Sequence, residues 1–115
     1  MIKYIALVLL LSSLCPNCIY VQDANVTVYS PELGGINCQE PCDLSSYMQP
    51  LDYDLGAACG PSVPYGALVF IEGVGMRKCL DHGGAIDDDE VDVLVHAEEY
   101  PSWISGERDV IWVIR

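Results

Sequence analysis

The sequence is poor in positive charge. Lys and Arg make up only 5 of its 115 residues, against 17 Asp and Glu, so the formal net charge is −12. Every acidic residue lies beyond Val21. Proteins that bind nucleic acid neutralise its phosphates with a basic face, and this chain has no cluster of cations from which to build one. We therefore exclude nucleic acid as a partner.

The sequence also lacks an apolar run long enough to cross a bilayer, which needs about 20 residues. The run from Ile5 to Leu14 follows the cation Lys3 and precedes the helix-breaking Pro16. This arrangement is typical of a signal peptide. We predict that residues 1–24 are one, with Ala24 the best cleavage point, and that the protein is secreted or resides in the periplasm or cell envelope. The alternatives are a buried helix, a membrane anchor, or a lipid anchor at a nearby cysteine.

A zinc site is not favoured, because the cysteines do not form two close pairs and the two histidines are scattered. We expect no metal and no cofactor. Beyond the export segment the cysteines are Cys38, Cys42, Cys59 and Cys79. Two disulfides are the natural inference for a small exported domain. Three pairings are possible, and the short Cys38–Cys42 loop favours a local bridge there, with Cys59–Cys79 as the second.

Residues 25–115 are sufficient for one domain. Turn residues separate short β-favouring runs, which predicts an all-β fold with a closed barrel. The expected strands are 25–30, 66–72, 76–80, 91–95 and 109–115. Residues 31–50, rich in Pro, Gly, Asn, Ser and Cys, predict a long loop, and 97–103 predicts one helical turn.

The most informative stretch is DHGGAIDDDEVDVLV, from Asp81 to Val95. A carboxylate at the end of one strand precedes the turn Gly83-Gly84, where a backbone can approach closely. A second carboxylate, Asp92, lies on the next strand, so the two acids are expected to share a cleft. The simpler interpretation is that both aspartates only accept hydrogen bonds from turn backbone.

This stretch resembles the three-aspartate (3D) domain, whose motif is Asp, a variable residue, Gly-Gly-Ala-Ile, a turn and a second Asp. Asp81, Gly83, Gly84, Ala85, Ile86 and Asp92 match it in type and spacing. Weaker likenesses are VTVYSP at 26–31, AACGPSVPYGALVFI at 57–71 and the closing DVIWVI. The resemblance implies a six-stranded double-psi β-barrel with a short helix, as in membrane-bound lytic transglycosylase A, rare lipoprotein A and, more distantly, the expansins.

The resemblance further implies a function at the bacterial cell wall. In the transglycosylase the aspartate matching Asp92 is the acid and base, and the one matching Asp81 supports it. Such an enzyme cleaves the bond between N-acetylmuramic acid and N-acetylglucosamine in peptidoglycan without water. The aromatic residues that could stack on sugar rings are Tyr29, Tyr65, Trp103 and Trp112. Of these, Trp103 in a polar loop is the expected sugar contact, with Gly83 and Gly84 also facing substrate. Trp112 is expected to be buried.

Two departures from the motif favour alternatives. Cys59 stands where the family has its first aspartate, so a wall-binding or wall-loosening module without catalysis is the second hypothesis. A stapled structural protein is the third. The turn before Asp92 carries the acidic run 87–90, which we interpret as a solvated turn, because a calcium loop needs a glycine at the position that Asp92 occupies.

Overall fold

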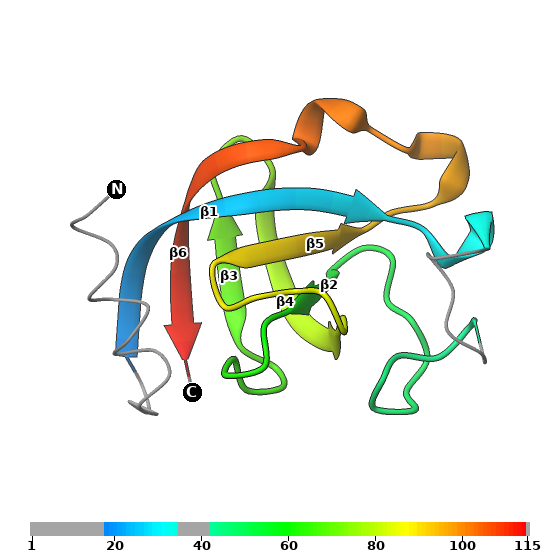
Figure 1. Ribbon diagram of the computed structural model, residues 1–115, viewed down its shortest axis with the longest axis horizontal. Coiled ribbons are helices and arrows are strands. Elements are labelled where there is room, and N and C mark those ends of the chain that lie inside the picture. The colour runs from blue at the N-terminus through cyan, green and yellow to red at the C-terminus, as the bar shows by residue number, and fades with distance from the viewer. Residues whose placement is uncertain (1–17, 35–41, 115) are drawn as a thin grey trace.

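A computed structural model describes residues 18–34 and 42–114 of the chain. Within these ranges the strands close into one six-stranded barrel (Figure 1). The strands are β1 (Cys18–Tyr29), β2 (Gly56–Cys59), β3 (Leu68–Ile71), β4 (Gly75–His82), β5 (Glu90–Leu94) and β6 (Gly106–Ile114). The described helical segments are 3-10 turns: η1 (Pro31–Leu33), η3 (Ala97–Glu99) and η4 (Ser102–Ile104). The predicted all-β barrel is therefore confirmed, and the predicted helical turn at 97–103 is replaced by two short 3-10 turns.

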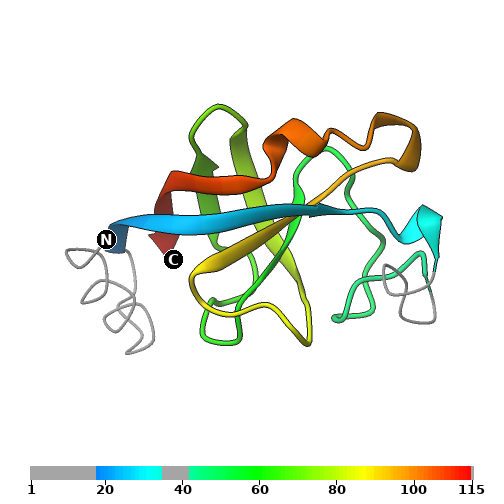
Figure 2. The ribbon, with the colours of Figure 1, turned by 45° about the horizontal axis from the view of Figure 1, so that its top comes forward.

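The barrel mixes parallel and antiparallel pairs. Around it the strands follow the order β1, β5, β2, β4, β3, β6, and β6 closes against β1. The pairs β1–β5 and β2–β4 are parallel, and the others are antiparallel. Strand β1 runs along most of the molecule in both views (Figures 1 and 2), pairing with β6 along its first part and with β5 along its last. Closure leaves no long edge strand exposed.

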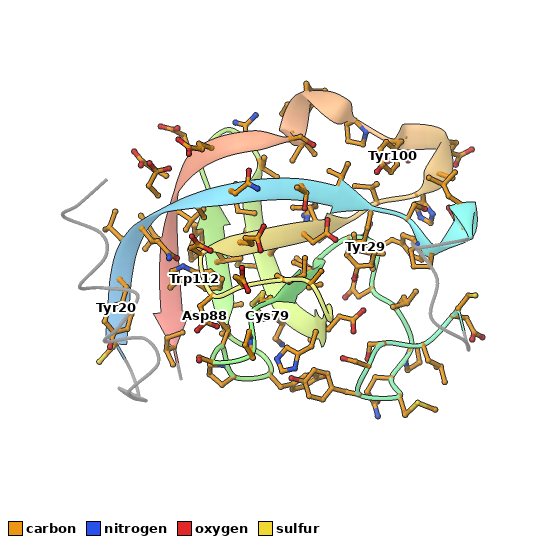
Figure 3. All side chains as sticks on the ribbon, in the orientation of Figure 1. Tyr20, Tyr29, Cys79, Asp88, Tyr100 and Trp112 are labelled. Carbon is orange, nitrogen blue, oxygen red and sulfur yellow. A yellow bond between two sulfur atoms is a disulfide. The ribbon has the colours of Figure 1, made fainter. Side chains whose placement is uncertain are left out.

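The core fills the barrel interior through strict alternation. Every second residue of β1, from Tyr20 to Val28, is buried. Strand β6 contributes the buried residues Val110, Trp112 and Ile114. Trp112 is fully buried, and its indole Nε1 donates to Oε1 of Gln22 at 2.6 Å. Figure 3 places Trp112 and Tyr20 toward the end of the barrel where β1 begins. Successive side chains of a strand point to opposite faces, so the inward positions form an apolar interior. The outward positions can therefore carry polar and ionisable side chains.

Strand β1 begins seven residues before the predicted strand at 25–30. Residues 18–24 lie opposite residues 108–114 of β6, and Ala24 and Gln22 are buried. Cleavage after Ala24 would remove this part of the strand from the barrel. Residues 1–17 of the predicted signal peptide lie outside the described residues, and the signal peptide stays a prediction.

Strand β2 was not predicted. Its sequence GAAC has weak β propensity. All of its residues are buried, and β2 lies between β5 and β4 in the barrel. Tertiary packing therefore makes this segment a strand.

The predicted Cys59–Cys79 disulfide is confirmed. It joins β2 to β4 with a Cα–Cα distance of 5.7 Å. Cys42 is also disulfide-bonded, but its predicted partner Cys38 lies outside the described residues. Cys18, which was expected to be removed, is disulfide-bonded as well. These bonds are compatible with an extracellular protein.

No helix in the described part of the chain is long and apolar enough to cross a membrane.

Candidate functional site

The strand register places the two predicted acids in one row across the barrel. Asp92 on β5 lies opposite Ala58 on β2, and Ala58 lies opposite Asp81 on β4. On its other side Asp92 is level with Thr27 of β1. The row Thr27, Asp92, Ala58, Asp81 thus crosses four strands, with one small residue between the carboxylates.

These side chains point away from the core because of the strand period. Val91 and Val93 are fully buried on either side of Asp92, so its carboxylate lies on the outer face of β5. In the same way Val26 and Val28 point inward, while Thr27 and Tyr29 point outward. The outer face of this part of the barrel is therefore polar.

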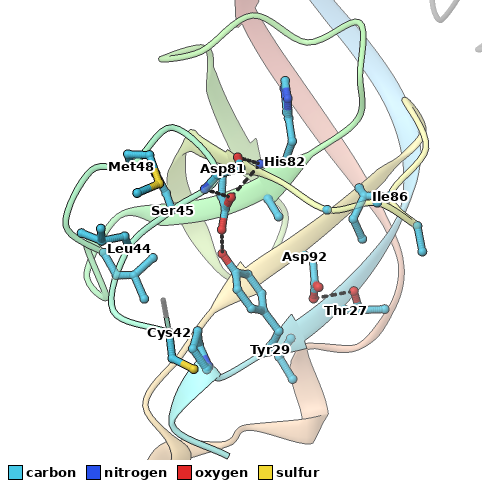
Figure 4. Close-up of a pocket in the computed structure, with 18 of the residues that line it drawn as sticks. Thr27, Tyr29, Cys42, Leu44, Ser45, Met48, Asp81, His82, Ile86 and Asp92 are labelled. Carbon is cyan, nitrogen blue, oxygen red and sulfur yellow. Dashed lines mark hydrogen bonds between the residues drawn. The ribbon is translucent and has the colours of Figure 1, made fainter. Parts of the chain in front are cut away.

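A cavity of about 720 Å³ lies over the row. Figure 4 shows Leu44, Ser45 and Met48 on one side of it and Ile86 on the other, with the two aspartates and Tyr29 between them. The walls come from the loop 42–51 and the turn after β4. Its lining residues are Thr27, Val28, Tyr29, Pro31, Cys42, Leu44, Ser45, Ser46, Met48, Leu51, Ala58, Asp81, His82, Gly83, Gly84, Ala85, Ile86, Asp92 and Tyr100. The cavity has the size of a small-ligand site.

Asp81 is held by three donors. The backbone N–H groups of Ser46 and His82 donate to its Oδ1 at 2.7 and 2.9 Å. The hydroxyl of Tyr29 donates to its Oδ2 at 3.2 Å. The carboxylate thereby ties the loop 42–51 to the end of β4 and keeps a fixed orientation toward the cavity (Figure 4).

Asp92 is an acid that burial keeps poorly solvated. Burial, followed by the nearby charges of Glu90 and Asp81, raises its pKa to about 6, although the hydrogen bond from Thr27 acts in the opposite direction. The hydroxyl Oγ1 of Thr27 donates to Oδ1 of Asp92 at 2.8 Å. A carboxyl group with a pKa near 6 can give a proton and take it back close to neutral pH.

Tyr29 completes the group. Burial, together with the charges of Asp81 and Asp92, raises the pKa of its phenol well above the ordinary value, so Tyr29 remains a hydrogen-bond donor at any physiological pH. The sequence predicted Asp81 and Asp92 as site residues but did not predict the hydrogen bond from Tyr29 to Asp81. The alternation in NVTVYS was the available signal, because it places Thr27 and Tyr29 on the face opposite the core.

The predicted glycines also lie at the cavity, whereas Trp103 does not. Gly83 and Gly84 both line it. A Cβ at Gly83 would come within 2.5 Å of Cγ1 of Ile86, so the turn needs glycine there. Trp103 is not among the lining residues, and its side chain is 63% exposed. The guanidinium of Arg108 lies 5.8 Å from the centroid of its ring. Its role as a sugar contact stays a prediction.

Cys59 is buried on β2, bonded to Cys79. The position of β2 that faces the cavity is its neighbour Ala58. The disulfide therefore braces the strand from the core side, and the row itself holds two acids rather than three.

The acidic turn before Asp92 forms a separate group. Carboxylate oxygens of Asp87, Asp89 and Glu90 lie within 4.8 Å of one another. Asp88 points elsewhere, accepting from the backbone N–H of Ser62 at 2.9 Å. The turn thus fastens the loop after β2. Exposed carboxylates alone do not define a metal site.

No family model matches the chain, and no curated protein matches it.

Proposed function

We propose that this protein is an exported, peptidoglycan-active protein of the three-aspartate type, and that it acts as a lytic transglycosylase. The observation that carries the proposal is the carboxyl group of Asp92, whose pKa is about 6 and which shares a cavity of about 720 Å³ with Asp81. The closed barrel with its two parallel strand pairs is compatible with the double-psi arrangement.

The reaction needs one group that works as acid and then as base. Protonated Asp92 gives its proton to the oxygen between N-acetylmuramic acid and the next sugar, and the bond from that oxygen to the anomeric carbon breaks. The carboxylate then takes a proton from a hydroxyl of the same muramic acid residue. The oxygen of that hydroxyl bonds to the anomeric carbon and closes an anhydro ring. Asp92 ends protonated again, and no water is consumed.

Asp81 supports this cycle as a fixed negative charge. Its three donors leave it oriented toward the cavity, and its charge adds to the effects that raise the pKa of Asp92. A carboxylate in the same cavity would stabilise the positive charge that develops on the sugar ring as the bond breaks. The division of roles follows from environment, since one acid is poorly solvated and the other is held by donors.

The test is digestion of purified peptidoglycan with the protein, followed by mass spectrometry of the products. We expect anhydro-ended fragments from the wild type and a loss of at least a hundredfold with Asp92→Asn. Asp89→Asn is the matched control, because it removes an equal charge from the exposed turn nearby. No product from the wild type, or equal product from Asp92→Asn, contradicts catalysis.

Ala58 favours a second candidate, a wall-binding module without catalysis. It lies between the two acids and carries no carboxylate, and Cys59, which matches the motif's first aspartate, is bonded to Cys79. Sedimentation with purified cell walls separates the candidates. Binding without anhydro products supports the module. A protein that neither binds nor cleaves the walls contradicts both candidates.

A further inference from the structure

A cluster of aromatic side chains borders the cavity beyond Asp81. The rings of Tyr47 and Tyr65 meet edge to face with centroids 4.5 Å apart. The ring of His82 lies 5.1 Å from that of Tyr47, whose hydroxyl is 2.9 Å from the histidine Nε2. We call Tyr47, Tyr65 and His82 the tyrosine ridge. It joins the loop 42–51 to the loop after β2, two segments distant in sequence.

The ridge continues the cavity wall. Ser46 and Met48, on either side of Tyr47, both line the cavity, and so does His82. The backbone N–H of Ser46 donates to Asp81. A molecule lying over the two aspartates would therefore reach the ridge without crossing another element.

The loop that carries Tyr47 is held in a strained shape. Met48 adopts φ of 59°, which costs a non-glycine residue about 1 kcal/mol or more. The buried side chain of Ser45 accepts from the N–H groups of Tyr47 and Gln49, at 3.2 and 3.4 Å. A bridge between Leu44 and Pro50 closes the loop. The Tyr47 ring is thus fixed in place before any ligand arrives, which lowers the entropic cost of binding.

The ridge and its neighbour Met48 also expose apolar surface beside the two aspartates. Tyr65 is 50% exposed and Met48 is 61% exposed. An aromatic ring with a hydroxyl at its edge offers an apolar face and a polar rim, and a pyranose sugar has the same division, with C–H groups on its faces and hydroxyls around its edge.

We propose that the tyrosine ridge binds one sugar ring of the glycan. This ring is the neighbour of the sugar whose glycosidic bond lies at Asp92. This inference rests on the proposed function for its substrate class and adds the contact residues that hold the neighbouring unit. It assigns the aromatic sugar contact to Tyr47, whose ring contacts the cavity-lining His82, and to Tyr65, whose ring packs on Tyr47. The ring of Trp103 contacts Arg108 instead and has no such link to the cavity lining.

The experiment is a titration of the full chain with soluble oligomers of N-acetylglucosamine and with solubilised peptidoglycan strands. Tyr65→Ala is expected to weaken binding of the longer oligomers roughly tenfold, while Tyr65→Trp restores it. Phe70→Ala is the matched control, since it removes an exposed aromatic ring from β3, outside the cavity lining, and is expected to leave binding unchanged. Trp103→Ala tests the rival sugar contact. Thermal unfolding of each variant verifies that the barrel is intact.

The outcomes separate the ridge from the proposed catalysis. If cleavage depends on Asp92 but Tyr65→Ala binds and cleaves as the wild type does, the ridge is overturned and the catalytic proposal stands. If Tyr65→Ala loses binding while the wild type makes no anhydro product, the ridge stands and catalysis is overturned. Loss of binding with Trp103→Ala instead, or no binding by the wild type, overturns the ridge.

Discussion

The barrel presents two outer faces that are built alike and differ in chemistry. On one, the row Thr27, Asp92, Ala58, Asp81 crosses four strands beneath a loop. On the other, the row Val21, Ile111, Phe70, Met76 crosses β1, β6, β3 and β4. The second row is apolar, and its members are 36 to 43% exposed. We call these the cavity face and the apolar face.

The two faces show that the outward positions of the strands, not the core, decide the chemistry of the surface over which the cavity forms. Strand β1 contributes to both faces, with Val21 near its start and Thr27 near its end. The residues between them alternate into one common interior. Each face can therefore be altered separately, provided that the inward residues stay unchanged.

The largest expected effect comes from shortening β1, which carries both faces. A chain that starts at Asn25 loses Gln22 and Ala24 from the core and the partner of the Trp112 indole. We expect it to lose its entire free energy of unfolding, which for a domain of this size is about 5–15 kcal/mol. Circular dichroism during urea titration measures this.

The control is a chain that starts at Ile19. It keeps the pairing of residues 19–24 with β6 and is expected to unfold cooperatively. If the chain that starts at Asn25 is equally stable, the first part of β1 is dispensable, and cleavage after Ala24 leaves an intact barrel.

Asp92→Asn on the cavity face is expected to raise the free energy of unfolding, by less than the truncation of β1 lowers it. Burial raises the folded-state pKa of Asp92 from an ordinary 3.8 to about 6, so folding favours its protonated form. The stabilising contribution is fully present below about pH 4 and is lost as the pH rises through 6. At pH 7 the substitution removes a charge that folding disfavours, and we expect a gain of up to roughly 3 kcal/mol.

Urea unfolding at pH 4 and pH 7 measures this gain, which should shrink at the lower pH. The exposed Asp89→Asn should show no comparable change at either pH. A destabilised Asp92→Asn at pH 7 would mean that the ionised carboxylate is well accommodated, and the acid role assigned to it would lose its physical basis.

The smallest effect is expected on the apolar face. Ile111→Thr keeps a β-branched side chain at a position that is 42% exposed and should change the free energy of unfolding by less than about 0.5 kcal/mol. Val110→Thr, one residue earlier and fully buried, should cost roughly 2 kcal/mol because its hydroxyl enters the core. Similar losses from both would show that the apolar face is covered in solution, and sedimentation velocity would then reveal an oligomer.

Much of the fold followed from local pattern. Alternation and turn residues predicted β3, β4, β5 and the later parts of β1 and β6. A strand with one buried face alternates apolar and polar residues, and this alternation is visible in the sequence. The start of β1 was assigned to an export segment, since IYVQDA at 19–24 adjoins an apolar run. Strand β2 was missed because GAAC carries no alternation.

The site was predicted in part for a similar reason. Asp81, Asp92 and the two glycines lie in one continuous motif, and the structure brings them to one cavity. The contributions of Tyr29, Ser46 and Tyr47 depend on loop and strand contacts across the fold, which no local pattern encodes.

By itself, the sequence determined the acidic character, the β class and the two aspartates, because composition, period and motif are local properties of the chain. It favoured the Cys59–Cys79 bond among three possible pairings, and the structure selected it. Only the tertiary structure decided that Ala58 separates the acids, that Tyr29 and Ser46 orient Asp81, and that burial raises the pKa of Asp92. These depend on strand register and loop packing, which bring together residues far apart along the chain.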